Sequence, residues 1–377
     1  MRKSIAIIIT SILVLSGCNK QQSVSDRLLN EVEKAIAINP DSASNLLKGI
    51  SSPEKLDNKT FARWCMLSGK ITDEIFNSIL PTYQLERAYD WYSSHGSPDE
   101  QVQILIYLGR SYFADGDYDK AMSIYTNALD IAEKNKLNNL TGYTYSYIGD
   151  LYGEKFMRTE AIKRYKAAAE CFKKENNTDS YACALRDVGR EYACIDSLSR
   201  ALKILTIADS VARNTKNIEV TASIDNALGN IYAMQNKYDK AEEYFLKALV
   251  GRETMPDYMA LIDLYIASGA INKAQELLSK ILQDNPKYTY SIKYLYYQIY
   301  NEEKNYKEAL TNLKEYVEIT DSIIYADNQS KILNIESKYN HLKISKEVDR
   351  LKIKQQSYII VLVICIGILL LLSLIHI

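Results

Sequence analysis

The sequence predicts an all-α protein, a solenoid of antiparallel helix pairs followed by a long helix and a C-terminal transmembrane helix. Three observations support this fold class. Small and aromatic residues recur at an interval of 40 residues, the spacing inside each copy is helical, and a long apolar run lies near the end of the 377-residue chain. A single helix pair cannot bury its apolar stripe alone, so the repeated pairs must stack on one another.

The repeat consists of six positions that hold similar residues in four copies. The copies are Leu108, Gly109, Tyr112, Ala121, Tyr125, Ala128; Ile148, Gly149, Tyr152, Ala161, Tyr165, Ala168; Val188, Gly189, Tyr192, Ala201, Leu205, Ala208; and Leu228, Gly229, Tyr232, Ala241, Phe245, Ala248. The first three and the last three positions of each copy follow helical spacing, so each copy predicts two helices. Polar turns such as Ala114–Asp117 and Gln235–Lys237 separate them. The small residues mark the place where the paired helices cross at close range.

This pattern resembles the tetratricopeptide repeat family, whose signature places small residues at the helix crossing and aromatic residues beside it. Two weaker copies follow, with Tyr265, Ala274 and Leu278, then Tyr300, Ala309 and Leu313. The resemblance implies a right-handed superhelical solenoid over residues 101–316, with four strong 40-residue repeats and two weaker ones. The family's usual unit has about 34 residues. The excess, for example residues 133–139, indicates a lengthened second helix followed by a polar loop.

Residues 19–100 are also helical in pattern and are predicted to form a degenerate repeat or cap in front of the solenoid. Apolar residues share one helix face between Leu28 and Ile36, and Asn39-Pro40-Asp41-Ser42 ends that helix and begins the next. Trp64, Trp91 and Tyr92 are expected to pack as a capping layer.

The chain begins with a segment typical of export. Met1-Arg2-Lys3 is basic, a short apolar run follows, and Leu15-Ser16-Gly17-Cys18 closes it. Residues 1–18 resemble a bacterial lipoprotein signal peptide, and this resemblance implies lipidation of Cys18 and contact with membrane lipid. The alternative is an uncleaved anchor, but the run is shorter than the about 20 apolar residues that a spanning helix needs.

Near the other end, residues 358–375 form an apolar run that predicts a transmembrane helix. Residues 317–357 precede it and predict a long membrane-proximal helix. The apolar stripe of this segment slips between Leu342 and Ile344, so a regular coiled coil is an alternative with only partial support.

These two anchors predict a protein of the bacterial cell envelope, held in the inner membrane with its repeats in the periplasm. Lys346, Arg350, Lys352 and Lys354 then lie outside, against the positive-inside rule. Residues 372–377, Leu-Ser-Leu-Ile-His-Ile, match the translation of a widely used transposase sequencing adapter. We therefore expect this end to be a sequencing artefact and the natural protein to continue past about Leu371, where its output region would lie.

Composition and motifs argue against several functions. The chain has 46 basic and 47 acidic residues, a net charge of −1, and no basic patch that would indicate nucleic-acid binding. The three histidines have no partner at metal-ligand spacing, and no glycine-rich phosphate loop is present. The sequence predicts no enzyme activity, no cofactor and no metal.

The family resemblance does imply a ligand groove lined by the first helix of each pair. Its contact positions correspond here to Ile106 and Arg110, Ser146 and Asp150, Arg186 and Arg190, and Asn226 and Asn230. Guanidinium groups bind carboxylates in bidentate fashion, so Arg186 and Arg190 favour an acidic or free-carboxylate peptide. The alternative is that these arginines only pair with Asp150, Asp187 or Glu191.

Two functions of different classes follow. The first is a sensor: the repeats bind a protein or peptide in the periplasm and form the input part of an inner-membrane signalling protein, with a homodimer favoured by the long helix. The second is an envelope scaffold or assembly lipoprotein that gathers protein partners. Carbohydrate binding through exposed Tyr and Trp is a third reading, but their repeat spacing indicates core positions.

Overall fold

The computed structural model of the protein describes residues 25–75, 79–284 and 289–325, together with residues 350, 351, 353, 354 and 356–358. Regular structure in these ranges is entirely helical. A helix over residues 25–36 is followed by α2 (Pro40–Lys48), η1 (Pro53–Lys55), α3 (Asn58–Ile75), α4 (Thr82–His95), α5 (Pro98–Ala114), α6 (Tyr118–Lys134), α7 (Asn138–Glu154), α8 (Arg158–Lys174), α9 (Thr178–Cys194), α10 (Leu198–Ala212), α11 (Ile218–Met234), α12 (Tyr238–Gly251), α13 (Met255–Ala267), α14 (Ile271–Asp284), α15 (Thr289–Glu302) and a helix over residues 306–325.

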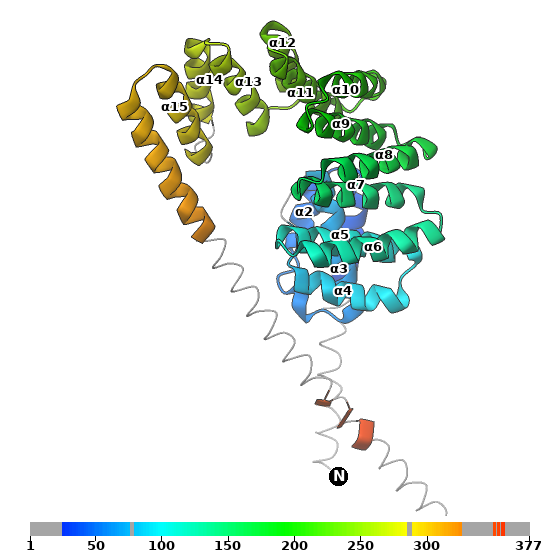
Figure 1. Ribbon diagram of the computed structural model, residues 1–377. Helices are drawn as coiled ribbons and strands as arrows, with labels where there is room; N and C mark the ends of the chain where they lie inside the picture. Colours follow the sequence, from blue (N-terminus) through cyan, green and yellow to red (C-terminus); the bar gives the residue numbers. More distant parts are fainter. Residues whose placement is uncertain are drawn as a thin grey trace, which may run out of the picture. The chain divides into compact units, whose positions relative to one another are not determined.

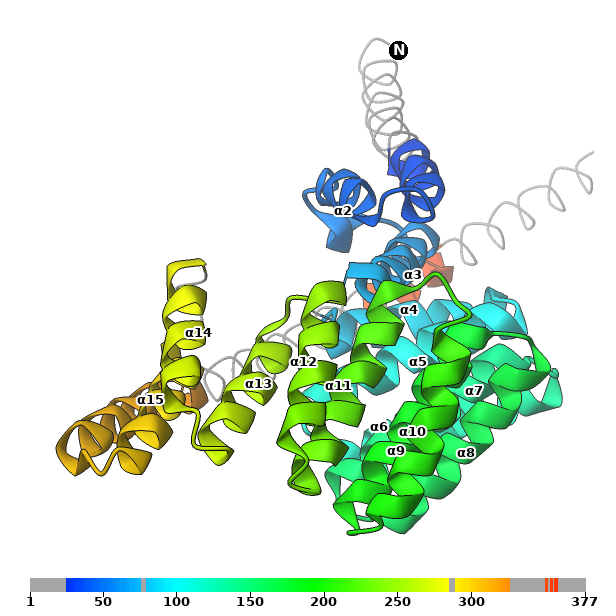
Figure 2. The same ribbon diagram turned by 90° about the horizontal axis from the view of Figure 1, so that it is seen from above.

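The 40-residue interval arises from two helices per copy, as the spacing predicts. The five helices α5 to α9 have 17 residues each, and turns of three residues join them. Successive helices pack antiparallel against one another along the chain, which Figure 1 and Figure 2 both show. The second helices α6 and α8 are no longer than the first helices α5 and α7, so the excess over the usual repeat is shared by both helices of a pair. The predicted polar loop after the second helix is only a tight turn.

Each of these turns is fixed by one residue in the left-handed backbone region. In the four turns between α5 and α9, and in the turns after α9 and α11, Gly116, Lys136, Phe156, Asn176, Asp196 and Asn236 have φ between 56° and 77°. After each of them, the next backbone N–H donates to a carbonyl in the last turn of the preceding helix, as from Met157 to Tyr152 at 2.8 Å. This is the Schellman pattern that ends a helix. It favours Gly or Asn because other side chains crowd the backbone there.

Side-chain caps begin several of the helices. Ser97 and Glu100 form a reciprocal capping box at α5, with Glu100 accepting from the Ser97 amide at 2.8 Å. Asn177 caps α9 and Asn217 caps α11, and each accepts from a backbone amide three residues later at 3.2 Å. These local signals agree with the apolar periodicity, so the helix boundaries follow from short-range sequence.

A missing side chain allows the helices of each pair to cross closely. A Cβ atom on Gly149 would lie 2.6 Å from Cε1 of Tyr165, so the aromatic ring occupies the space that any larger residue would need. The same relation joins Gly109 to Tyr125, Gly189 to Leu205 and Gly229 to Phe245. The large side chains are buried, with Tyr125 1% exposed, and they form the centre of each repeat.

The apolar core is divided along the array rather than gathered at one centre. One cluster joins α3 to α7, a second joins α8 to α11, and a third joins α12 to α15. In the first cluster Tyr92 is buried, and Trp64 and Trp91 are partly buried against that cluster. Trp64 also packs against a separate cluster that includes Leu29 and Leu67, so a capping layer made of these residues stays a prediction. The two weaker repeats are helix pairs as well, α13 with α14 and α15 with the helix over residues 306–325, and their signature residues Ala274, Leu278 and Ala309 are buried.

The chain divides into two compact units, Met1–Val317 and Glu318–Ile377. Residues 317–325 are helical, as predicted for the segment 317–357. The rest of that segment lies mostly outside the described residues, as do Cys18, the predicted signal peptide and the apolar run after Tyr358. Within the described part of the chain, no helix combines the length and apolarity needed to cross a membrane.

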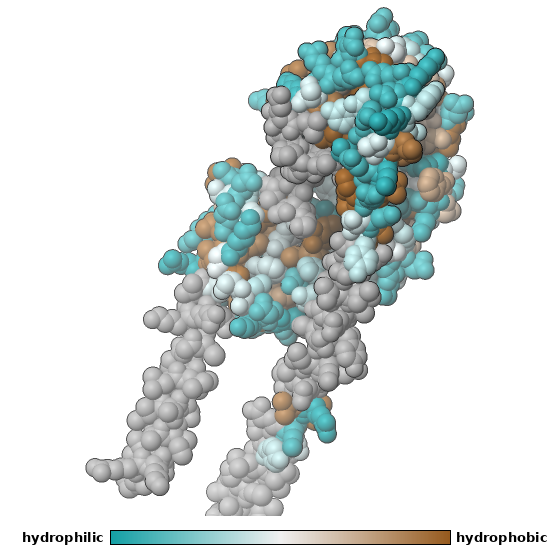
Figure 3. Space-filling view, turned by 90° about the vertical axis from the view of Figure 1, so that its left-hand side faces the viewer, coloured by the Kyte–Doolittle hydropathy of each residue, from teal (hydrophilic) through white to brown (hydrophobic). Residues whose placement is uncertain are grey.

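On the face drawn in Figure 3, polar residues cover much of the coloured surface, with smaller apolar patches among them.

Candidate functional site

The first helices of successive pairs, α3, α5, α7, α9, α11 and α13, contact one another and form what we call the inner face. The Tyr143 and Ser180 hydroxyls, 2.9 Å apart, join α7 to α9, and Arg186 Nη1 donates to Ser223 Oγ on α11 at 3.0 Å. The second helices α6, α8, α10 and α12 pack mainly against first helices. An array that is closer on one side curves toward that side, so the inner face is concave.

The first hollow on the inner face lies between α3, α5 and α7 and has a volume of about 430 Å³. It is lined by Lys70, Thr72, Asp73, Gln103, Ile106, Tyr107, Arg110, Leu140, Tyr143 and Tyr147. Two of the predicted contact residues, Ile106 and Arg110, are therefore placed together here. Arg110 forms an ion pair with Asp73, and its guanidinium lies 5.5 Å from the ring centre of Tyr147. Tyr107 also donates to Asp73, at 3.0 Å.

A second hollow, which we call the α7–α9 hollow, has a volume of about 470 Å³. Its lining residues are Phe113, Ser146, Asp150, Gly153, Glu154, Phe156, Arg158, Tyr165, Arg186, Asp187, Arg190 and Glu191. Four of the predicted groove positions, Ser146, Asp150, Arg186 and Arg190, thus line one surface. The helix α7 contributes to both hollows, so the two are adjacent along the inner face.

The arginines of the α7–α9 hollow are already paired. Arg186 donates to both carboxylate oxygens of Asp187, at 2.9 and 3.1 Å. Arg190 approaches the same carboxylate at 3.9 Å and is 65% exposed. Burial by itself would lower the pKa of Arg186, but the attraction to Asp187, Cys183 and Asp150 and the hydrogen bond to Asp187 together outweigh burial, so the pKa is raised. The alternative interpretation, in which these arginines pair with neighbouring acids, describes their contacts in the structure.

The third arginine of the hollow follows the same pattern. Arg158, at the start of α8, lies 3.3 Å from both carboxylate oxygens of Glu191, which is buried on α9. This pair joins two neighbouring repeats. A carboxylate with so little exposure needs a cationic partner, so we assign Arg158 and Glu191 a structural role.

Asp150 is held differently, by a hydrogen bond from a tyrosine. Tyr165 Oη donates to Asp150 Oδ1 at 2.6 Å. Tyr165 belongs to the second helix α8, and its ring reaches the inner face by passing beside Gly149. Asp150 lies on the exposed part of the inner face. The surrounding protein nevertheless displaces enough water from its carboxylate to raise its pKa to about 6. The hydrogen bond from Tyr165 lowers the pKa and so opposes this change only in part.

The remaining predicted contacts, Asn226 and Asn230 on α11, line neither hollow. Asn226 donates to Asp257 on α13 at 2.9 Å, and Asn230 donates to Asn226 at 2.9 Å. Asp257 is 0% exposed and also accepts two bonds of 2.9 Å from Arg252. The structure thus gives the amide of Asn226 a partner inside the fold, and it does not bring the two asparagines together with Arg186 and Arg190.

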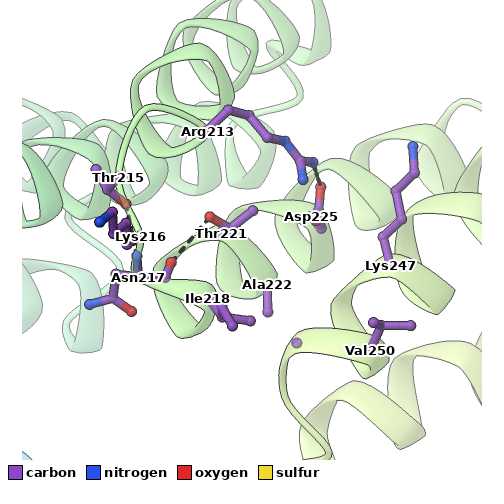
Figure 4. A pocket seen from close by; sticks show the side chains of 11 residues that line it. Arg213, Thr215, Lys216, Asn217, Ile218, Thr221, Ala222, Asp225, Lys247 and Val250 are labelled. Atoms are coloured by element: carbon purple, nitrogen blue, oxygen red, sulfur yellow. Dashed lines mark hydrogen bonds and ion pairs between the residues drawn. The ribbon is translucent and has the colours of Figure 1, made fainter.

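A further hollow, of about 440 Å³, lies between the turn that follows α10 and the helices α11 and α12 (Figure 4). Arg213 Nη2 donates to Asp225 at 2.5 Å, and Lys247 is another lining residue (Figure 4). Burial raises the pKa of Asp225 to about 6 although Arg213 opposes the shift. Asp225 is 2% exposed, so its carboxylate needs the cationic partner that Arg213 supplies within the fold, and none of the predicted contact residues lines this hollow.

Sequence reasoning missed Asp73, Tyr107, Tyr147, Phe156 and Tyr165 among the lining residues. One signal for α3 was available, because Gly69 stands 40 residues before Gly109 and extends the repeat by one copy. The rule of fixed groove positions considers first helices only, so it omits any side chain that enters from a second helix or a turn. Tyr165 and Phe156 enter in these two ways.

Comparison with known families supports the repeat interpretation. A family model for the tetratricopeptide repeat matches residues 100–174, and a second one of the same description matches residues 221–255. The chain contains tetratricopeptide repeats. The first match covers α5 to α8 and the second covers most of α11 and α12. Such repeats are generally protein-interaction modules without catalytic activity.

Solved structures with the same kind of helix array include two Rap proteins. A Rap protein complexed with Competence and Sporulation Factor is 18% identical, with a TM-score of 0.62 over 81% of this chain and 88% of that one. The apo form of RapI is 14% identical, with a TM-score of 0.53 over 84% and 96%. A tetratricopeptide repeat protein from Parabacteroides merdae is 16% identical, with a TM-score of 0.49 over 72% and 99%. At these identities the likeness concerns the fold. A search of curated proteins finds no match.

Proposed function

We propose that the inner face of the tetratricopeptide repeats binds a segment of a protein or peptide. The observation that carries this proposal is a pair of adjacent hollows, of about 430 and 470 Å³. Helix α7 contributes lining side chains to each of them. Each is within the roughly 300–1,000 Å³ of typical ligand pockets. The Rap protein of similar fold was solved complexed with Competence and Sporulation Factor, which supports ligand binding as the role of this chain.

The chemistry of the first hollow suits a side chain that is apolar with a polar edge. Tyr107, Tyr143 and Tyr147 supply aromatic surface, while Arg110 and Asp73 supply a charged pair that is already balanced. Aromatic side chains of this kind give large contact area at low cost in conformational entropy. A ligand therefore gains affinity here mainly by burying apolar surface against the tyrosines.

Binding through the inner face can be tested by filling the first hollow. Phage-displayed random dodecapeptides are selected on the full chain, and their affinities are measured by fluorescence anisotropy. Gln103→Trp places a large ring in the hollow, and we expect it to weaken binding at least tenfold. Ser123→Trp, which adds the same ring on the exposed surface of α6, should leave affinity unchanged. Peptides that bind both variants equally would argue that the inner face is not the binding surface.

We further propose that this binding module is the periplasmic sensor of an inner-membrane signalling protein. Support comes from the lipoprotein-like residues 1–18 and the apolar run 358–375. An envelope scaffold that gathers protein partners is the alternative. Labelling with radioactive palmitate should mark the wild-type protein and not Cys18→Ala, and a reading frame that continues past residue 371 into an output domain would favour the sensor over the scaffold. Absence of label from the wild type would remove the lipid anchor.

A further inference from the structure

We propose that the α7–α9 hollow is a subsite for a cationic side chain, Lys or Arg, of the bound protein segment, with Asp150 as its counter-ion. This inference rests on the proposed function, because it names the chemistry that one part of the inner face selects. It also differs from the acidic ligand that Arg186 and Arg190 suggest in the sequence.

The charge pattern of the hollow provides the first argument. Its lining contains four carboxylates, Asp150, Glu154, Asp187 and Glu191, and three guanidinium groups, Arg158, Arg186 and Arg190. The carboxylate of Asp187 serves both Arg186 and Arg190, and Glu191 serves Arg158. Among the described residues, Asp150 and Glu154 form no ion pair, and their hydrogen bonds come from the phenols of Tyr165 and Tyr118. An acidic ligand would compete with Asp187 for the arginines, whereas a cation meets in Asp150 a carboxylate that forms no ion pair and feels Arg186 and Arg190 only at longer range.

The environment of Asp150 makes that carboxylate a strong partner. It lies one helical turn from Glu154 on α7, and Asp187, Arg186 and Arg190 line the hollow from α9. Because the site is partly shielded from water, a charge pair formed here is screened less than one on an open surface. A hydrogen bond that involves charged groups contributes about 1.5–3 kcal/mol, which corresponds to roughly a tenfold to hundredfold gain in affinity.

The second argument is the conformation of Phe156, which also lines the hollow. Phe156 has φ of +58° and is 80% exposed, so its ring has little contact with the protein core. The corresponding turns place Asn176 and Asn236 in the same conformation, at 56° and 58°. A bulky residue is disfavoured there, and strain of this kind is often retained at functional sites. Core packing does not explain the choice of Phe at this turn, because the ring contacts the guanidinium of Arg158 and is otherwise mostly exposed, whereas a ligand contact would use that exposed ring.

The aromatic rings complete the chemistry for a cation. Phe113 lines the same hollow as Phe156, and the guanidinium of Arg158 already lies 5.0 Å from the ring centre of Phe156. The face of an aromatic ring attracts cations, and its edge packs against the methylene stem of a Lys or Arg side chain. A carboxylate with two phenyl rings in one hollow is therefore suited to a long cationic side chain.

The experiment uses acetylated, amidated dodecapeptides based on the tightest peptide selected on the full chain. One position at a time is made Lys, norleucine or Glu, and dissociation constants are measured by fluorescence anisotropy. At one position, we expect the Lys peptide to bind the wild type about tenfold more tightly than the norleucine peptide. Asp150→Asn should abolish this difference, while Asp130→Asn, the same charge change on exposed α6, should retain it. Phe156→Asn should weaken binding of the Lys peptide by roughly threefold to tenfold.

Three outcomes would overturn the inference. They are a preference for Glu at every sensitive position, which would assign the hollow to an acidic ligand; no charge preference at any position; and a Lys preference that survives Asp150→Asn. Each leaves the proposed function intact, because peptides still bind and Gln103→Trp still weakens them. If no dodecapeptide binds in a manner sensitive to Gln103→Trp, the proposed function itself fails.

Discussion

Tyr165 on α8 donates a hydrogen bond of 2.6 Å to Asp150 on α7, and the ring that carries this hydroxyl occupies the space left by Gly149. One residue of the repeat signature therefore has two effects. It allows the helices to cross closely, and it lets a polar group from the second helix reach the inner face. Phe245 in the last strong repeat occupies the same position beside Gly229 but has no hydroxyl to offer.

Gly149→Ala should destabilise the protein by about 1–3 kcal/mol, because the new Cβ would lie 2.6 Å from the ring of Tyr165 and force the helix pair apart. Gly153→Ala in the same helix is the matched control. Its Cβ would come no closer than 3.4 Å to a neighbour, and Ala favours a helix by about 0.5–1 kcal/mol over Gly. Urea denaturation followed by circular dichroism measures both. Equal stabilities of the two variants would contradict the packing argument.

Asp150→Asn should stabilise the protein at pH 7.5 and much less at pH 4. The pKa of Asp150 is raised from 3.8 to about 6 by desolvation, so the folded state binds this proton more tightly than the unfolded state. The stabilisation linked to that proton is present below about pH 4 and is lost as the pH rises through about 6. Asn removes the cost of this partly desolvated charge above that range. Because Asp150 is exposed and solvent screens part of the effect, we expect about 1 kcal/mol.

Thermal unfolding of Asp150→Asn and wild type at a series of pH values provides the measurement. Groups near Asp150 also titrate or carry charge, namely Glu154, Arg158, Tyr165, Arg186, Asp187, Arg190 and Glu191. Their interactions with one another are shared by both proteins and cancel in the difference, whereas their interactions with the Asp150 charge are part of what the difference measures. A stability difference that stays constant between pH 4 and pH 7.5 would be inconsistent with the raised pKa.

Phe156→Asn should stabilise the protein by about 0.5–1 kcal/mol, because Asn adopts the left-handed conformation at lower cost than Phe and the exposed ring contributes little packing. Asn176→Phe makes the reverse change at an equivalent turn and should lower stability by a similar amount. Chemical denaturation of both variants is the test. A loss of stability in Phe156→Asn would show that the ring is needed for the fold, which would weaken its assignment as a ligand contact.

The sequence predicts the fold well because its signals are local and repeated. The spacing of Gly109, Tyr125 and Ala128 recurs in each strong copy, so helix pairs and their crossing follow from periodicity. The candidate site is less predictable because it depends on pairing. Groove positions identify Arg186 and Arg190 correctly as lining residues, but only the structure shows that Asp187 turns toward Arg186 and that Asn226 turns toward Asp257. The spacing of residues in a helix predicts which face of the helix a side chain lies on. It does not predict which neighbouring group that side chain binds.

The ion pair between Arg252 and Asp257 leads to the last prediction. Asp257 is 0% exposed, and Arg252 donates to both of its oxygens at 2.9 Å, while Asn226 donates a further bond. Arg252→Met keeps much of the aliphatic bulk but leaves a buried carboxylate without its cation. Removing one partner of a buried pair costs about 3–5 kcal/mol, and the bonds from Asn226 and Thr254 keep the expected loss near the lower end.

The matched control is Arg27→Met, which removes an arginine that is 83% exposed and lies 3.5 Å from Glu31. Surface pairs of this kind contribute about 0–1 kcal/mol, so Arg27→Met should be close to wild type in urea denaturation. Adding Asp257→Asn to Arg252→Met should recover part of the lost stability, because the amide removes the uncompensated charge while it still accepts from Asn226. If Arg252→Met were as stable as Arg27→Met, the ion pair would not be needed to stabilise the buried carboxylate. The hydrogen bond from Asn226 would then be a sufficient partner for Asp257.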